Sequence, residues 1–189
     1  MLALIKKSFL VLAVWTFITG ALYPLAVTGV AKVFFPFRSE GSIIISKGVS
    51  RGSALIGQYF DGPRYFHSRP SATGPFPYNA ASSAASNLGP LNPNLEKTVK
   101  ERVKALRSII PAGVKIPVDL VTSSGSGLDP HICPAAAFLQ AASVAGARNA
   151  DEAKIRALVD KHREDKLFGI FGETVVNVVK LNIALDELP

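Results

Sequence analysis

The stretch SFLVLAVWTFITGALYPLAVTGVA, residues 8–31, contains 24 consecutive residues without a formal charge. As a helix it would extend about 36 Å, which is enough to cross the hydrocarbon core of a bilayer with some tilt. Two lysines, Lys6 and Lys7, precede it, and the basic and aromatic sequence KVFFPFR, residues 32–38, follows it. We therefore predict a tail and transmembrane anchor helix over residues 1–36 and a separate soluble domain over residues 37–189.

The same stretch has an alternative interpretation as a cleaved signal peptide. Residues 6–21 combine a basic start, an apolar run and small residues near Ala21. The apolar core of a signal peptide is typically about 7–15 residues long, whereas here the apolar run continues to Phe35. This difference favours an uncleaved anchor. Pro24 would interrupt the helical hydrogen bonds in mid-span, which predicts a kink or a contact with other protein helices.

The flanking charges bear on the orientation of this anchor. Lys6 and Lys7 on one side are opposed by Lys32 and Arg38 on the other. Large domains that follow an anchor translocate with little regard to their own charge, so the short N-terminal tail is the more natural cytoplasmic side. We expect a single-pass protein of the inner (plasma) membrane, in contact with lipid, with its N-terminus in the cytoplasm and its body extracytoplasmic.

The composition of the chain argues for a folded body without nucleic-acid or metal partners. The net charge is +7, but Lys6, Lys7 and Lys32 belong to the apolar segment and its flanks. Without them, eighteen basic and fourteen acidic residues give the rest of the chain a net charge of +4. No aromatic residue interrupts the densest basic cluster, LEKTVKERVKALR at residues 95–107, so we predict no nucleic-acid binding. The single cysteine, Cys133, excludes an internal disulfide, and the three histidines lack the spacing of metal ligands.

The pattern of the body predicts a small α+β domain that mixes helices and strands. A long region rich in Gly, Pro, Ser and Asn, residues 52–94, separates its first strand from its first helix, and such regions are usually disordered or functional. Its aromatic residues argue against simple disorder. We predict strands over residues 41–46 and 115–123 and within residues 174–188. We predict helices that begin at Pro93 with Asn92 as cap, at Pro134 after Cys133, and after a capping pair of Asn149 and Glu152.

The loop TSSGSGLDPHICP, residues 122–134, contains the ingredients of several kinds of site. A serine hydrolase elbow needs serine at the centre of its motif, where this loop has Gly125, and a phosphate loop needs a lysine that is missing here. A triad of Ser126, His131 and Asp129 cannot be inferred from adjacency. We interpret the loop as a stiff connection from a strand to a helix N-terminus, which could receive an anion and would lower the pKa of an exposed Cys133 thiol.

Six motifs are spread along nearly the whole chain: GSALIGQYF (52–60), YFHSRPSA (65–72), YNAASSAASNLGPLNP (78–93), IPVDLVT (116–122), SGSGLDPHICPAAA (124–137) and GETVVNVVKLNIALD (172–186). With these motifs the chain closely resembles the family of C subunits of Kdp-type potassium-transporting ATPases. The family tends to have serine in place of Cys133 and a glycine within the segment SSAAS, residues 82–86.

The resemblance implies a subunit of a P-type ATPase complex for high-affinity potassium uptake. The implied partners are a channel-like subunit that selects potassium, a P-type ATPase subunit that ATP phosphorylates, and a small single-span subunit. The chain itself would be a non-catalytic accessory and assembly subunit, with its body near the entrance of the channel-like subunit. It has no Asp-Lys-Thr-Gly phosphorylation motif and no Thr-Val-Gly-Tyr-Gly filter. ATP and potassium would therefore be handled by the complex, and we expect no cofactor on this chain.

The family also raises an alternative role as a catalytic chaperone that increases the ATP affinity of the ATPase subunit. This role would place the loop against nucleotide in the cytoplasm, through Ser123, Ser124, Gly125, Ser126 and Gly127. In the accessory role, by contrast, polar residues of the body would face partners or the ion path, where carboxylates bias the local cation concentration. The candidates for these positions are Asp119, Asp129, His131, Asn87 and Asn92.

Overall fold

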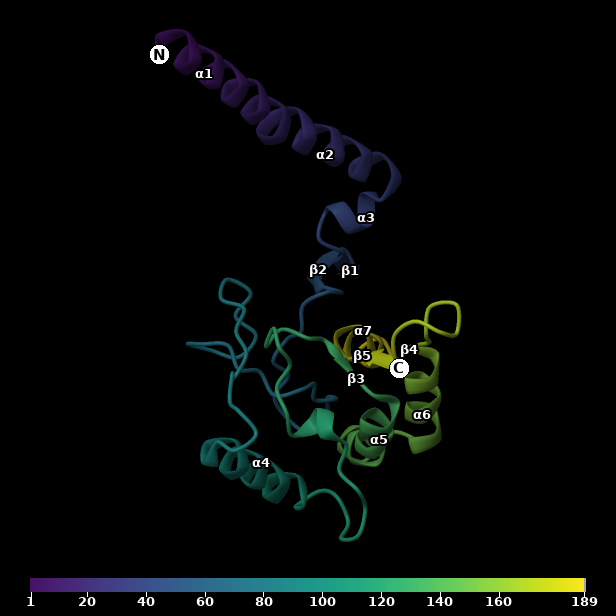
Figure 1. Cartoon of the computed structure of the whole chain (residues 1–189). Helices are drawn as coiled ribbons and strands as arrows, with labels where there is room; N and C mark the ends of the chain where they lie inside the picture. Colours follow the sequence, from purple (N-terminus) through teal and green to yellow (C-terminus); the bar gives the residue numbers. More distant parts are fainter. Residues whose placement is uncertain (189) are drawn as a thin grey trace. The chain divides into compact units, whose positions relative to one another are not determined.

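A computed structural model describes residues 1–188, which divide into two compact units, Met1–Ile43 and the chain from Ile44 onward (Figure 1). The first unit is dominated by one continuous helix, Leu2–Phe34, with a mean hydropathy of 1.9 and no buried residues. It is long and apolar enough to cross a membrane. The helix comprises α1 (Leu2–Phe17), a π-helical turn η1 (Ile18–Leu22) and α2 (Tyr23–Phe34), and the short helix α3 (Pro36–Ser39) follows.

The π-helical turn explains how the helix accommodates Pro24. A proline inside a helix lacks an N–H and crowds the carbonyl four residues before it. Here the N–H of Tyr23, the residue before the proline, donates to the oxygen of Ile18, five residues back. A π-helical turn contains one residue more than an α-helical turn, and this wider turn accommodates Pro24. The helix therefore continues past the proline, where we expected an interruption.

A small hairpin follows, formed by β1 (Ile43–Ser46) and β2 (Val49–Ser53), and it confirms the first predicted strand. Lys47 and Gly48 connect the strands, and both have positive φ, as a two-residue hairpin turn of type I′ requires. A segment without helix or strand then leads to α4 (Pro93–Leu106). Asn92 caps α4 as predicted, since its side-chain oxygen accepts the N–H of Asn94 at 2.9 Å.

The core lies where three helices pack around a three-stranded sheet (Figure 1). The central strand β5 pairs antiparallel with β3 on one side and β4 on the other. Helix α5 is rich in alanine, which lets α6 and the sheet approach its backbone closely, and four of its alanines are buried. These elements are β3 (His131–Ile132), α5 (Pro134–Arg148), α6 (Glu152–Lys161), β4 (Arg163–Glu164), β5 (Val175–Asn177) and α7 (Val178–Leu185). The mixed helix and strand content agrees with the predicted α+β class.

Three predicted elements differ from the structure. Residues 115–123 form no strand: they contain the 3₁₀ turn η2 (Val118–Leu120), because the N–H and hydroxyl of Thr122 both bind the oxygen of Val118. The predicted capping pair is also wrong. Asn149 ends α5 in a left-handed conformation, and Asp151 caps α6 by accepting the N–H of Ala153.

The predicted C-terminal strand is confirmed only over three residues. Asn177 ends β5 and at once caps α7, because its side-chain oxygen accepts the N–H of Lys180 at 3.1 Å. The Val- and Ile-rich sequence after it is helical instead. Val178, Val179, Leu181 and Leu185 of this helix are buried, so the apolar run is explained by a helix facing the core from several sides.

The long region between β2 and α4 is irregular but tightly attached to the core. Phe66 is fully buried, and its N–H and C=O both bind the side-chain amide of Asn182 at 2.9 Å. The side-chain amide of Gln140 in α5 binds the backbone of His67 in the same way. Its oxygen accepts the His67 N–H at 2.8 Å, and its nitrogen donates to the His67 carbonyl oxygen at 3.1 Å. Two buried side-chain amides thus replace the neighbouring strand that an extended segment normally needs.

Candidate functional site

A cluster of charged side chains lies beside the Gly/Ser loop. The Nη1 atom of Arg69 is 3.8 Å from Oδ1 of Asp119 and 3.6 Å from Oδ2 of Asp129. Arg69 also donates to the backbone oxygen and hydroxyl of Thr122, at 3.5 and 3.4 Å. Arg69 therefore meets residues 119–129, a stretch some fifty residues later in the sequence, at one guanidinium. The two carboxylates were among the predicted site residues but this arginine was not, since its only signal in the sequence is its place in the motif YFHSRPSA.

His131 joins the cluster through Asp129. The Oδ1 atom of Asp129 is 3.1 Å from Nδ1 of His131 and accepts the His131 backbone N–H at 3.0 Å. On the far side of the ring, Nε2 lies 3.3 Å from the side-chain nitrogen of Asn177. An amide nitrogen only donates, so this geometry fits a neutral imidazole with its proton on Nδ1.

The same contacts fix the ionisation of Asp129. Its partial burial opposes a charge, but the two hydrogen bonds from His131 and the nearby Arg69 guanidinium outweigh that effect. The pKa of the Asp129 carboxyl is consequently lowered from its ordinary value. The group is held as a carboxylate, which suits both an ion pair and attraction of a cation.

The Gly/Ser loop directs much of its hydrogen bonding to itself. The hydroxyl of Ser124 accepts the N–H of Gly127 at 2.9 Å, and the hydroxyl of Ser126 accepts the N–H of Leu128 at 3.1 Å. Gly127 has φ +67°, and a Cβ there would lie 2.5 Å from the oxygen of Ala84. Gly125, by contrast, has open space around it and no positive φ. The loop is therefore shaped by one of its two glycines.

The preceding irregular region holds this loop in place from outside. The hydroxyl of Ser71 donates to the oxygen of Gly127 at 2.7 Å, and the N–H of Ala84 donates to the oxygen of Ser126 at 3.0 Å. The hydroxyl of Tyr78 binds the oxygen of Arg69, so the same region positions the guanidinium. These contacts join motifs that are separated by some fifty residues, and they favour the predicted structural role of the loop.

The charged cluster and the loop share one depression of about 460 Å³, which Leu55 and Pro130 also line. The five residues predicted to contact nucleotide in the alternative role are Ser123, Ser124, Gly125, Ser126 and Gly127. The first four line the depression, together with Arg69, Asp129 and His131. Gly127 lies against Ala84 and Thr73 instead. The depression can receive a polar or charged group, because the Asp129 carboxylate, the Arg69 guanidinium and the serine hydroxyls line it.

The geometry gives no support to a hydrolytic triad. No hydrogen bond joins Ser126 to His131 in residues 1–188, because the serine hydroxyl binds within its own loop and the imidazole is taken by Asp129 and Asn177. Within the same range, no group of three His, Cys, Asp or Glu side chains is arranged to hold a metal ion.

Cys133 is less reactive than its place before a helix suggests. Its thiol is half-buried, and its N–H donates to Oδ2 of Asp119 at 2.8 Å. Burial, together with the neighbouring Asp119 carboxylate, raises the pKa of the Cys133 thiol. The lowered pKa was expected for an exposed thiol; Cys133 is half-buried, and desolvation and a negative neighbour outweigh the helix terminus.

The two predicted asparagines lie outside the depression. Asn92 acts as the cap of α4, and Asn87 is an exposed residue with a left-handed backbone, φ +51°. Neither lines the cavity that Asp129 and His131 line. Asp119 reaches the cluster only through Arg69 and the N–H of Cys133.

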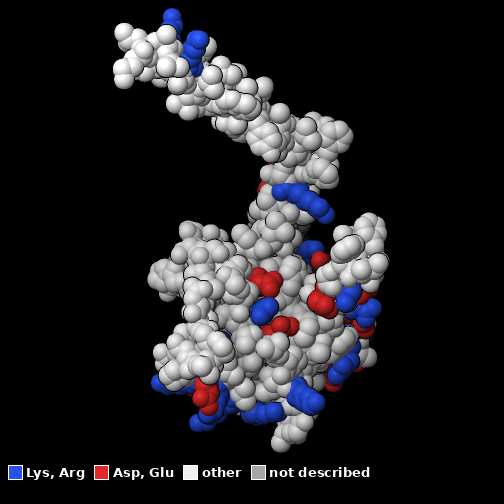
Figure 2. All heavy atoms as spheres, viewed as in Figure 1, with Lys and Arg blue, Asp and Glu red and all other residues white. Residues whose placement is uncertain are grey.

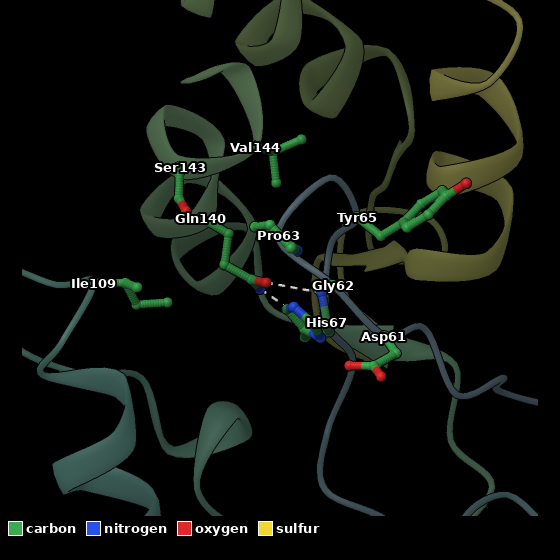
Figure 3. A pocket seen from close by; sticks show the side chains of 9 residues that line it. All are labelled: Asp61, Gly62, Pro63, Tyr65, His67, Ile109, Gln140, Ser143 and Val144. Atoms are coloured by element: carbon green, nitrogen blue, oxygen red, sulfur yellow. Dashed lines mark hydrogen bonds between the residues drawn. The ribbon is translucent and has the colours of Figure 1, made fainter. Parts of the chain in front are cut away.

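A second pocket, of about 300 Å³, lies where α5 faces the irregular region (Figure 3). Figure 3 shows the side chain of Gln140 turned toward the backbone of His67, with Asp61 at the opposite edge. Both polar ends of the Gln140 amide are occupied by His67 and Ala136. The pocket walls are mostly apolar, so the contacts there hold the fold together rather than prepare a catalytic group.

Comparison with known proteins identifies the family. A family model described as "KdpC: K+-transporting ATPase, c chain" matches residues 5–187. The chain is 51% identical over 189 residues to the potassium-transporting ATPase KdpC subunit of Dechloromonas aromatica, covering 100% of this chain and 99% of that one. It is 53% identical over 184 residues to the KdpC subunit of Methylococcus capsulatus, with 97% of each chain covered. It is 52% identical over 187 residues to that of Sorangium cellulosum, with 98% of each covered. The chain therefore belongs to the KdpC family of potassium-transporting ATPase subunits.

Proposed function

We propose that this chain is a non-catalytic accessory subunit that stabilises the potassium-transporting ATPase complex. In this proposal the apolar helix anchors it in the membrane, and the body lies on the extracytoplasmic side near the entrance of the channel-like subunit. The partners are that subunit, the P-type ATPase subunit and the small single-span subunit. The Asp119 and Asp129 carboxylates then face the region where potassium gathers before entry.

The observation that carries the proposal is the use of the Gly/Ser loop for structure. The N–H groups of Gly127 and Leu128 bind hydroxyls of their own loop, and the oxygens of Ser126 and Gly127 bind the irregular region. A phosphate-binding loop instead aims its N–H groups at the ligand and adds a lysine. No Lys lines the depression beside this loop. The loop is built to connect elements.

The side of the membrane decides between the accessory role and the chaperone role. Cys133 is a poor site for labelling because its thiol is half-buried and its pKa is raised. We therefore choose a Cys133→Ser background with a cysteine at exposed Ser86, and a matched chain with a cysteine at exposed Ala3. A membrane-impermeant maleimide is applied to intact spheroplasts and to lysed ones.

The accessory proposal expects Ser86→Cys to be labelled in intact spheroplasts, and Ala3→Cys only after lysis. Labelling of Ser86→Cys only after lysis would place the body in the cytoplasm and overturn the topology. The cysteine at residue 3 lies at the opposite end of the anchor from residue 86. Its labelling therefore shows whether the maleimide has leaked through the membrane of intact spheroplasts.

The catalytic chaperone remains the second candidate function, supported by the hydroxyls of Ser123, Ser124 and Ser126 that line the depression. It is separated from the first by two measurements on the assembled complex. The accessory role expects Asp129→Ala to shift the potassium dependence of ATPase activity while Ser126→Ala leaves ATP affinity unchanged. A fall in ATP affinity with Ser126→Ala, without any change in potassium dependence for Asp129→Ala, would support the chaperone.

A further inference from the structure

The turn between β4 and β5 exposes four large apolar side chains within five residues. Leu167, Phe168, Ile170 and Phe171 are 62%, 84%, 74% and 65% exposed. The neighbouring strand β5 is different, because Val176 is fully buried. We call residues 167–171 the apolar loop. Figure 2 shows it as an uncharged projection of the body, at the place where Figure 1 draws the yellow-green loop before β5. Apolar clusters exposed in this way mark interaction sites.

The backbone of the apolar loop is already hydrogen-bonded. The N–H of Leu167 donates to the oxygen of Phe171 at 2.8 Å, and the reverse bond from Phe171 to Leu167 measures 3.0 Å. The N–H groups of Gly169 and Ile170 bind oxygens of residues 166 and 167. Unpaired backbone N–H and C=O groups are the main cost of placing non-helical chain in an apolar environment. Because most of these groups are already paired within the loop, its transfer into such an environment would leave few of them without a partner.

The charges at the base of the apolar loop are paired. Lys166 lies 3.4 Å from Glu173, and Arg163 lies 3.2 Å from Asp165. The loop thus offers no cluster of unneutralised cations that would depend on anionic headgroups. Its attraction for an apolar environment comes from the side chains of the tip, so it does not require a particular headgroup charge.

The position of the apolar loop on the body indicates what it meets. Within the second unit, the loop and the β1–β2 hairpin lie at one end and α4 at the other (Figure 1). The chain enters this unit at Ile44, at the hairpin end. Only nine residues, 35–43, separate Ile44 from the end of the apolar helix at Phe34, a reach of at most about 36 Å. The hairpin adds exposed Ile45 and Val49 to the same end.

We propose that the apolar loop inserts its side chains into the headgroup and acyl boundary of the bilayer that holds the anchor. The body would then touch the membrane at two points, through the anchor and through this loop. Two attachment points fix the orientation of the body over the membrane surface, which a single tether does not. The inference goes beyond the accessory role, and it holds whichever side of the membrane the body occupies.

The test uses the full chain in phosphatidylcholine vesicles, with Cys133→Ser and an environment-sensitive fluorophore on one introduced cysteine. One chain carries the fluorophore at Ile170→Cys, in the apolar loop. The matched control carries it at Leu91→Cys, a residue that is 97% exposed and precedes α4 at the other end of the body. Vesicles with nitroxide-bearing phosphatidylcholine in both leaflets report contact of each fluorophore with lipid.

We expect the emission at residue 170 to shift to the blue and to be quenched several-fold more by nitroxide lipid than the emission at residue 91. Adding Phe168→Asn and Phe171→Ser should lower the quenching at residue 170 to that of the control. Phe168 has φ +54°, a conformation that asparagine tolerates better than phenylalanine, so the variant should fold. Equal quenching at both positions would overturn the proposal. So would a blue shift at residue 170 that occurs only in the assembled ATPase complex, since that result assigns the loop to a protein partner.

Discussion

Asn182 is the residue on which the attachment of the irregular region depends most directly. Its amide is fully buried and satisfies both the N–H and the C=O of Phe66. We predict that Asn182→Ala lowers the free energy of unfolding by about 2–4 kcal/mol, because two buried backbone groups lose their partners. Denaturant unfolding of the detergent-solubilised full chain measures this. Asn94→Ala, at an exposed position of α4, is the matched control and should change it by less than about 0.5 kcal/mol. Equal effects would show that the amide contacts contribute nothing.

The Asp129 carboxyl makes the stability of the folded body depend on pH in the acid range. Its pKa is lower in the folded chain than in the unfolded one, so the folded state binds fewer protons. Its contribution to stability is therefore present above the unfolded pKa of about 3.9 and is lost as the pH falls through the folded value. We predict that the unfolding free energy of Asp129→Asn falls less steeply than that of the wild type between about pH 5 and pH 3. If the unfolding free energies of the wild type and of Asp129→Asn fell in parallel with pH, Asp129 would not contribute to the loss of stability in acid.

At the scale of the element, the Gly/Ser loop depends on one glycine and not on the other. Gly127 has φ +67°, and an added Cβ would meet backbone and side-chain atoms at 2.5 and 2.8 Å. We predict that Gly127→Ala costs at least about 2 kcal/mol of stability, whereas Gly125→Ala is close to neutral. Thermal unfolding of the two variants side by side measures the difference. A destabilising Gly125→Ala with a neutral Gly127→Ala would contradict the geometry.

Helix α6 provides a second test at this scale, because its cap differs from the one that the sequence suggested. Asp151 accepts the N–H of Ala153 at 2.9 Å, while Asn149 closes α5 with φ +53°. We predict that Asp151→Ala costs about 1 kcal/mol of unfolding free energy. Asn149→Gly should be nearly neutral, because glycine adopts the same backbone conformation without strain. If Asn149 were the cap of α6, its replacement would be the more damaging of the two.

The elements that the sequence predicted well are those with a local signal. The apolar N-terminal helix, the hairpin strand and the start of α4 depend on apolar run length, alternation and a cap followed by proline. The errors have non-local causes. Residues 115–123 look like a strand, but no strand within residues 1–188 pairs with them, and the Thr122 hydroxyl binds the oxygen of Val118 instead. The meeting of Arg69 with Asp119 and Asp129 joins distant segments, so no local pattern could reveal it.

At the scale of the whole molecule, the apolar helix is the part of the chain that fits a membrane. None of residues 2–34 is buried, and most of their apolar side chains are exposed, which water would disfavour and a lipid environment would not. The body has a core of its own from residue 44 onward. The first unit thus contains the helix that could cross a membrane, and the second contains the polar depression.

The division predicts a position-dependent response to charge in the helix. Ile18 lies at the middle of Leu2–Phe34, where an arginine costs about 2.5–3.5 kcal/mol in membrane insertion. Ile5 lies near the end, where an arginine reaches the interface. We expect Ile18→Arg, but not Ile5→Arg, to lower the fraction of chain that resists alkaline carbonate extraction.

The mass of the wild-type chain recovered from membranes should include residues 1–34. A shortened chain in the soluble fraction would instead identify the segment as a cleaved signal peptide and leave the body without its anchor.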